Sequence, residues 1–123
     1  MKELFSVKGI VTKGQGQGKL LGFPTANIPL VGTIPEGIYA GSVEIDGNTY
    51  YSASFVGSAK TFQRTDVKVE SFIFDFADDI YGKSITVRLY KKIRDNKKFA
   101  SVEELVDQIK KDVEAVRQFF SLQ

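Results

Sequence analysis

The spacing of the apolar runs along the chain constrains the fold more than any other feature. Five short runs are rich in β-branched and aromatic residues and show stretches of period-two alternation, which is typical of strands. They cover residues 5–11, 38–45, 49–56, 67–76 and 84–93. Between the second and third runs lies Asp46-Gly47-Asn48, which predicts a hairpin turn because Gly and Asn tolerate positive φ. Strands joined by such short connections must pair mostly antiparallel.

One helix is expected after these strands. Ser101 to Glu104 read as a capping box, in which the serine accepts from the first-turn amides while Glu104 reaches back. Apolar residues then recur at helical spacing as one stripe: Val102, Leu105, Val106, Ile109, Val113, Val116 and Phe120. An amphipathic helix of this kind lies on a sheet or barrel.

Composition narrows the class of protein. A chain of 123 residues with 42% hydrophobic residues fits one domain, residues 1–123, that buries its own core. Cysteine and histidine are both absent, so a general base must be Asp, Glu, Lys or Tyr, and a bound metal must accept oxygen ligands. The N-terminal run is too charged for a signal peptide, and no run approaches the ~20 apolar residues of a membrane span. We expect a cytoplasmic protein.

Residues 13–22, KGQGQGKLLG, form a glycine-rich run. The run fails the Walker A pattern, because only three residues separate Gly14 from Gly18 and Leu20 follows Lys19; it fails the dinucleotide fingerprint as well. It is either a flexible hairpin loop or a backbone cradle for phosphates, in which Lys19 adds a positive charge.

Thr25 and Asn27 form a second candidate site. Pro24 biases Phe23 toward an extended conformation, and in an extended chain residues 25 and 27 point to the same side. Their neutral oxygens suit a Mg²⁺ ion whose charge is compensated mainly by nucleotide phosphates. The alternative is that both side chains satisfy backbone groups of the loop.

Two charged features each leave two interpretations open. Alternation places Glu70 on the same face as Phe72, Phe74 and Phe76, so its carboxylate is either at the wet end of a strand or held in a pocket. A basic run is either solvated surface or an anion site, and the net charge of +2 is too small to indicate nucleic acid. This run contains Lys91, Lys92, Arg94, Lys97 and Lys98.

The order of these motifs resembles a known family. The glycine-rich run leads into LGFPTANI at residues 21–28, followed by PEGIY at 35–39, the strand with Glu70, IYGK at 80–83, IRDNKKF at 93–99 and the helical segment 101–112. From about Gly9 to Arg117, this succession closely resembles the riboflavin kinase (flavokinase) family, and in particular the C-terminal domain of bacterial bifunctional riboflavin kinase/FAD synthetases. PTAN is the most specific of the motifs.

The resemblance implies a six-stranded antiparallel Greek-key β-barrel with a C-terminal helix. It also implies transfer of the γ-phosphoryl group of ATP, with Mg²⁺, to the ribityl 5′-hydroxyl of riboflavin, giving FMN and ADP. By the same resemblance Glu70 is the catalytic base, Thr25 and Asn27 hold the metal and phosphates, and two further groups bind the ligands. The nucleotide group adds Gly14, Gly16, Gly18, Lys19, Ile73, Asp75 and Tyr81, and the flavin group comprises Arg94, Lys97 and Phe99.

Two departures from the family pattern bear on activity. The family often has an Asn-Ile-Gly-x-x-Pro-Thr-Phe type of segment where this chain has residues 54–62, in which the asparagine and proline are absent. The family also often has a histidine where this chain has Phe72. These changes affect the geometry of the local loop and the catalytic rate rather than the fold.

Two alternative functions remain. They are a non-catalytic flavin or FMN sensor on the same fold, and a small barrel that binds single-stranded nucleic acid. The intact Thr25, Asn27 and Glu70 favour the enzyme, and we expect a monomer with neither a nucleic acid nor a membrane as partner.

Overall fold

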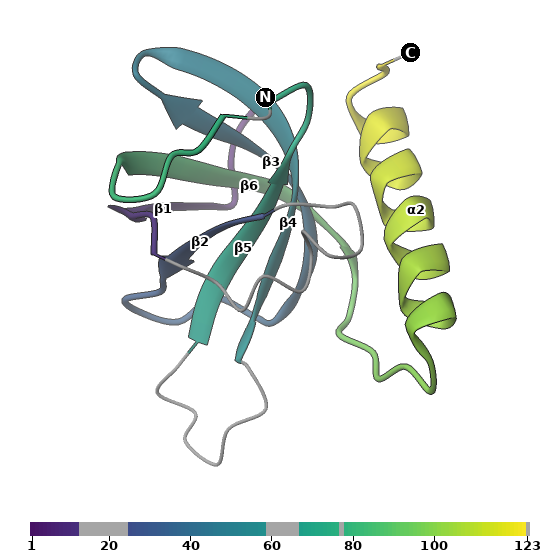
Figure 1. Cartoon of the computed structure of the whole chain (residues 1–123). Helices are drawn as coiled ribbons and strands as arrows, with labels where there is room; N and C mark the ends of the chain where they lie inside the picture. The colour runs from purple at the N-terminus through teal and green to yellow at the C-terminus, as the bar shows by residue number, and fades with distance from the viewer. Residues whose placement is uncertain (13–24, 59–66, 77, 123) are drawn as a thin grey trace.

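The computed structural model describes residues 1–12, 25–58, 67–76 and 78–122. In this part of the chain six strands are followed by one helix: β1 (Phe5–Ile10), β2 (Ala26–Pro29), β3 (Gly37–Ile45), β4 (Asn48–Ser58), β5 (Val67–Ile73), β6 (Ser84–Arg94) and α2 (Val102–Phe119). The strands are antiparallel in the order β1-β6-β3-β4-β5-β2 (Figure 1). The predicted class, an antiparallel barrel with a C-terminal helix, is confirmed.

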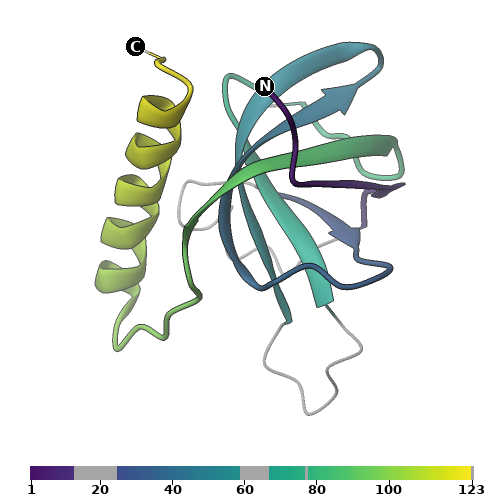
Figure 2. The same cartoon turned by 180° about the vertical axis from the view of Figure 1, so that it is seen from behind.

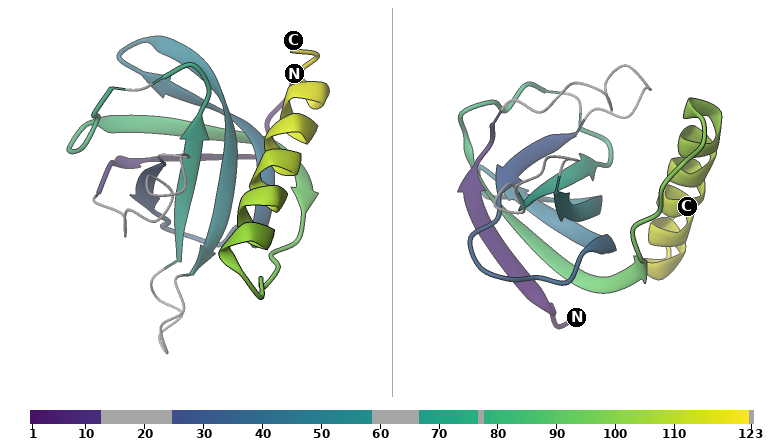
Figure 3. Two further views of the ribbon diagram at one scale, coloured as in Figure 1. Left: turned by 45° about the vertical axis from the view of Figure 1, so that its right-hand side comes forward. Right: turned by 90° about the horizontal axis from the view of Figure 1, so that it is seen from below.

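The two edge strands of this order nearly close the barrel. Beyond β1, the amide of Thr12 donates to the carbonyl oxygen of Asn27 in β2 at 2.8 Å, and the two residues form an isolated antiparallel bridge. Seen from below, the strands curl into a ring with α2 outside it (Figure 3). The sequence predicts an extended chain at residues 25–27 but no strand there. In the structure this segment pairs with β5 and forms strand β2.

Alternating residues of the strands fill the barrel interior with branched aliphatic side chains. Val43, Val56, Val69, Val87 and Leu89 are each fully buried. Side chains of this shape suit the pleated, two-sided packing of strands.

Three serines also lie in the interior. Ser52, Ser54 and Ser71 are fully buried, and their hydroxyls form a chain: Ser52 to Ser54 at 3.0 Å and Ser54 to Ser71 at 2.7 Å. A buried hydroxyl is costly unless it is hydrogen-bonded. The serines therefore satisfy one another within an otherwise apolar core.

Helix α2 packs on the outer face of the barrel, against β3, β4 and β6 (Figure 2). A second apolar cluster fills the contact, with Ala40, Phe74 and Val116 buried at its centre. The capping box is confirmed, since Glu104 N donates to Ser101 Oγ at 3.2 Å, although the Glu104 carboxylate accepts from Ala100 N. Val102 belongs to the predicted apolar stripe, but it is more than half exposed.

Two predicted boundaries are corrected. The β3–β4 hairpin turns at Asp46 and Gly47, whose φ angles are 51° and 83°, and Asn48 already pairs with Ile45. Strand β5 ends at Ile73 rather than at residue 76, because Asp75 takes a φ of 57° that interrupts the alternation.

The early end of β5 separates the three phenylalanines expected to share a face with Glu70. Phe72 does share it, and Phe74 follows into the helix-facing cluster, where the two ring centroids are 5.6 Å apart. Phe76 packs instead against Tyr50 at the barrel core, with 5.0 Å between ring centroids.

The described part of the chain contains no helix long and apolar enough to cross a lipid bilayer.

Replacing Leu89 should test how much the interior contributes to stability. Leu89→Ala removes a fully buried side chain and leaves a cavity, so we expect the free energy of unfolding to fall by about 2–5 kcal/mol. Leu4→Ala makes the same substitution at a residue that is 59% exposed, and should change it by about 0.5 kcal/mol or less. Urea denaturation followed by circular dichroism measures both; equal losses would contradict the assigned core.

Candidate functional site

The strand register brings residues of five strands into one row on the barrel. Asn27 of β2 lies opposite Glu70 of β5, and Glu70 lies opposite Phe55 of β4. Phe55 lies opposite Ile38 of β3, which in turn lies opposite Arg94 of β6. Residues directly opposite one another share a face of the sheet. We call these five residues the cross-strand row.

The row lies on the outer face of the barrel. Val69 and Ser71, the neighbours of Glu70 along β5, are fully buried in the interior, so the alternation turns Glu70 outward. Neighbouring strands are about 4.8 Å apart, which separates Glu70 from Arg94 by about 14 Å along the surface. The row therefore has two polar ends with Phe55 and Ile38 between them.

Asn27 has a buried oxygen without a partner. Its side-chain nitrogen donates to the carbonyl oxygen of Thr25 at 3.5 Å, while among the described residues nothing hydrogen-bonds to its buried Oδ1. An unsatisfied buried acceptor costs about 1–3 kcal/mol. A neutral amide oxygen of this kind suits a hard cation or a hydrogen-bond donor on a ligand, and Asn27 is the register partner of Glu70.

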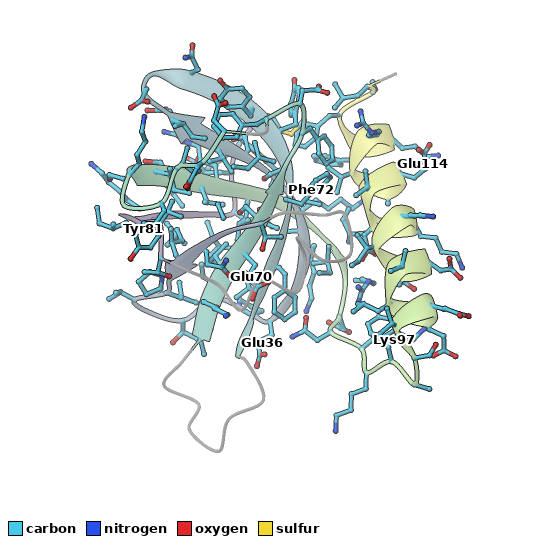
Figure 4. The ribbon with its side chains drawn as sticks, in the orientation of Figure 1. Glu36, Glu70, Phe72, Tyr81, Lys97 and Glu114 are labelled. Carbon is cyan, nitrogen blue, oxygen red and sulfur yellow. The ribbon has the colours of Figure 1, made fainter. Side chains whose placement is uncertain are left out.

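Glu70 is neither at the end of its strand nor in a closed pocket. It lies midway along β5, and its side chain is 31% exposed (Figure 4). Lys68, two residues earlier on the same face, places Nζ 3.3 Å from Glu70 Oε1. The ion pair orients a carboxylate that remains partly exposed to solvent.

The other residues predicted to border the nucleotide are spread out. Ile73 is buried inside the barrel, on the opposite face from Glu70, so only its main chain can meet a ligand on the outer face. Asp75 is exposed in the turn after β5. Tyr81 is 59% exposed and lies on the far side of the molecule from α2 (Figure 4). Gly14, Gly16, Gly18 and Lys19 lie outside the described residues.

Arg94, at the end of the row, is bound to α2. Its Nε and Nη2 donate to the two carboxylate oxygens of Asp112, each at 2.8 Å. The Asp112 side chain is only 6% exposed and also accepts from Gln108 Nε2 at 3.0 Å. This paired geometry is the strong form of a charge-assisted contact. The arginine expected to touch flavin is thus a fixed link between barrel and helix.

Phe99 lies between two cations. The Arg94 guanidinium carbon and Lys97 Nζ are each 5.8 Å from its ring centroid, within the range of cation–π attraction. Lys97 is exposed at the foot of α2 (Figure 4). The structure therefore brings together all three residues predicted to bind flavin.

A second ion pair anchors the chain as it leaves β6. Lys92 Nζ lies 2.5 Å from Asp95 Oδ1, and this hydrogen bond holds the pKa of Asp95 below its usual value and the pKa of Lys92 above its own. The lowered pKa of Asp95 means that the attraction is present above the ordinary pKa of Asp and is lost as the pH falls through the folded-state pKa. The pair is exposed, so it orients the loop more than it stabilises the fold.

Sequence reasoning missed three residues of this surface. Lys68 could have been found from its i, i+2 spacing to Glu70 in a strand. Phe55 and Asp112 could not, because the first depends on the β4–β5 register and the second on how α2 docks.

The fold and the row define a small antiparallel barrel with a polar binding face. A family model described as flavokinase, riboflavin kinase, matches residues 1–120. The chain therefore belongs to the riboflavin kinase family.

Relatives and solved structures agree with this membership. The chain is 43% identical over 122 residues to a trifunctional protein RibF/MnmA of Mycoplasmoides gallisepticum, covering 97% of the chain and 19% of the relative. It is 38% identical over 125 residues to a bifunctional riboflavin kinase/FMN adenylyltransferase of Bacillus subtilis, covering 96% and 40%. The chain thus spans two fifths or less of these relatives.

Two solved structures share the fold. One, titled a macrolide-efflux protein from Streptococcus pneumoniae, has a TM-score of 0.82 and 40% identity over 91% of this chain and 38% of its own. The other, riboflavin kinase from Trypanosoma brucei, has a TM-score of 0.68 and 28% identity over 98% of this chain and 82% of its own.

The Arg94–Asp112 pair should contribute strongly to stability. Asp112→Ala leaves the arginine half-buried without its partner, and breaking a buried pair in this way costs roughly 3–5 kcal/mol. Asp107→Ala, at an exposed position of the same helix, is the matched control and should be close to neutral. Denaturant midpoints of both variants measure the effect; a neutral Asp112→Ala would mean that the pair contributes no net stability.

Proposed function

We propose that this chain is a riboflavin kinase domain over residues 1–123, which transfers the γ-phosphoryl group of ATP to the ribityl 5′-hydroxyl of riboflavin in the presence of Mg²⁺. The products are FMN and ADP. The cross-strand row carries the proposal: it pairs Asn27, whose buried oxygen has no hydrogen-bond partner among the described residues, with Glu70, about 14 Å from the cationic and aromatic group at Arg94. All five residues belong to one barrel, so the proposal needs no second chain.

The two ends of the row match the two ends of the acceptor. Riboflavin carries its reactive hydroxyl on a flexible chain, away from its planar ring. With the hydroxyl at Glu70, the ring extends toward Phe99, where Arg94 and Lys97 supply positive charge. Phe55 and Ile38, the apolar residues in the middle of the row, would contact the ribityl chain and the edge of the flavin ring.

Glu70 supplies the base. Its carboxylate accepts the proton of the 5′-hydroxyl as that oxygen bonds to the γ-phosphorus, and the bond from this phosphorus to the oxygen shared with ADP breaks. Lys68 holds the carboxylate in place at 3.3 Å before the substrate arrives. Phosphoryl transfer requires mainly positioning and charge stabilisation, which this arrangement provides.

Asn27 and Thr25 would hold the metal. The unpartnered Oδ1 of Asn27 fits an oxygen-seeking divalent cation, and Thr25 is two residues away at the start of the same extended segment. When bound, Mg²⁺ would neutralise charge on the phosphates. A reaction that draws on ATP would take place in the cytoplasm.

The products formed from riboflavin provide the first test. With riboflavin and MgATP, the 123-residue chain should form FMN, because the row places one base against one hydroxyl. It should form no FAD, since the row offers a site for phosphorylating a hydroxyl and not for joining two nucleotides. Chromatography of the flavins measures both outcomes. Unchanged riboflavin, or accumulation of FAD, would contradict the proposal.

Two substitutions should fail in different ways and separate an enzyme from a flavin sensor. Glu70→Gln keeps the shape but removes the base, so kcat should fall by about 10²–10⁴ while riboflavin binding survives. Asn27→Ala removes an oxygen ligand and should raise the Mg²⁺ and ATP concentrations needed for half-maximal rate. Steady-state kinetics with Mg²⁺ titration, and circular dichroism as the folding control, measure these effects. Wild-type turnover in Glu70→Gln would remove Glu70 from the mechanism.

A further inference from the structure

The chain that leaves β6 crosses the ends of two neighbouring strands. A Cβ at Gly37, the first residue of β3, would lie 2.7 Å from the carbonyl oxygen of Arg94 and 2.5 Å from Lys92 Cε. No side chain fits there. The bare backbone of Gly37 therefore allows the end of β6, from which the loop of residues 95–100 leaves, to lie close against the start of β3.

Asn96 then caps the free edge of β4. The β3–β4 pairing stops at Gly37 and Val56, so beyond that point β5 is the one strand among the described residues that pairs with β4. Asn96 Nδ2 donates to the carbonyl oxygen of Val56 at 3.4 Å and to Glu36 Oε1 at 3.2 Å. One side chain thus ties the loop after β6 to both strands.

Phe55 and Asn96 both lie over a second bare glycine. A Cβ on the buried Gly57 would collide with Phe55 Cζ, and would lie 2.8 Å from Phe55 Cε2 and 3.1 Å from Asn96 Nδ2. The ring and the amide therefore share the space above Gly57. We call Glu36, Phe55, Gly57 and Asn96 the loop clasp.

The loop clasp joins the two ends of the candidate site. Phe55 is the register partner of Glu70, and Asn96 directly precedes Lys97 in the loop that also carries Phe99. Glu36 and Glu70 lie on the same side of the barrel, with Lys97 across from them (Figure 4). Movement of the loop away from β4 would change the distance between the carboxylate and the cationic group.

We propose that the loop clasp is a positioning device for the flavin, which fixes residues 97–99 at the correct distance from Glu70; this rests on the proposed function. Asn96 and Glu36 act through the loop and touch no reacting atom. Loosening the clasp weakens binding of the flavin and leaves ATP binding unchanged, because Thr25 and Asn27 lie on β2 and the segment before it, at the other end of the row.

The test reverses the polarity of one hydrogen bond. Asn96→Asp is nearly isosteric but replaces the donor by a carboxylate that faces Glu36 Oε1 and the Val56 carbonyl. Adding Glu36→Gln supplies a donor to that carboxylate and should restore one bond. Ala100→Ser, at an exposed position of the same loop, is the control for nonspecific effects on the loop.

The readouts are the riboflavin Kd, from quenching of flavin fluorescence, and the KM for ATP. Loss of two hydrogen bonds predicts about a tenfold rise in the riboflavin Kd for Asn96→Asp, with the KM for ATP unchanged within about twofold. The double variant should recover at least about threefold, and Ala100→Ser should match wild type. Asn96→Ala, which adds no charge, should show a rise of the same sign.

The outcomes separate the two proposals. A wild-type chain that binds no riboflavin overturns the proposed function and the loop clasp together. A wild-type chain that binds riboflavin while Asn96→Asp and Asn96→Ala bind it equally well overturns the loop clasp alone. If the riboflavin Kd and the KM for ATP change equally, or if the double variant shows no recovery, these residues act in general stability. Either result also overturns the loop clasp.

Discussion

The fork of two hydrogen bonds between Arg94 and Asp112 holds the helix, the loop and the barrel in one arrangement. It fixes the last residue of β6 to the middle of α2, so the residues between them must bridge a set distance. Within that bridge Asn96 reaches β4, and Phe99 lies against the same guanidinium. Because Asp112 is buried, moving the arginine away would leave the Asp112 carboxylate as an unpaired buried charge. Arg94, which the proposed reaction would use as a cation for the flavin, is therefore also part of the contact between barrel and helix.

Strand β5 serves two purposes through its pleat. Its inward residues complete the core, and Ser71 extends the chain of buried hydroxyls, while its outward residues Lys68 and Glu70 form the reactive surface. A shift of register by one residue would exchange the two faces and place a carboxylate in the apolar interior. The aliphatic core therefore determines the orientation of Glu70, and the precision of the site follows from the packing beneath it.

The sequence predicts the parts of this molecule that depend on local chemistry. Long alternating runs predict β1 and β3 to β6, and the capping box predicts the start of α2. Strand β2 has only four residues and becomes a strand through β5, which no local pattern shows. The end of β5 is overestimated because apolar residues continue past Asp75, and the pattern of apolar residues does not show the positive φ that this aspartate adopts. Asn27 and Glu70 are found as separate candidates, but their pairing depends on the strand register, and the hydrogen bond of Asn96 to Val56 depends on the path of a loop.

The closure of the barrel at Thr12 and Asn27 makes β2 a site of local opening. Within the described residues β2 pairs with β5 along its full length, whereas its other edge meets the chain after β1 at one bridge. Such a short, weakly held strand belongs to the low end of the range of local opening free energies. Its amide protons would exchange with solvent well before those of β3 or β6, through excursions that leave the aliphatic core intact. Loss of the Asn27 oxygen from its place beside Glu70 would then be a frequent, reversible event in a chain that is still folded, and a bound ligand bridging β2 and β5 would slow this exchange.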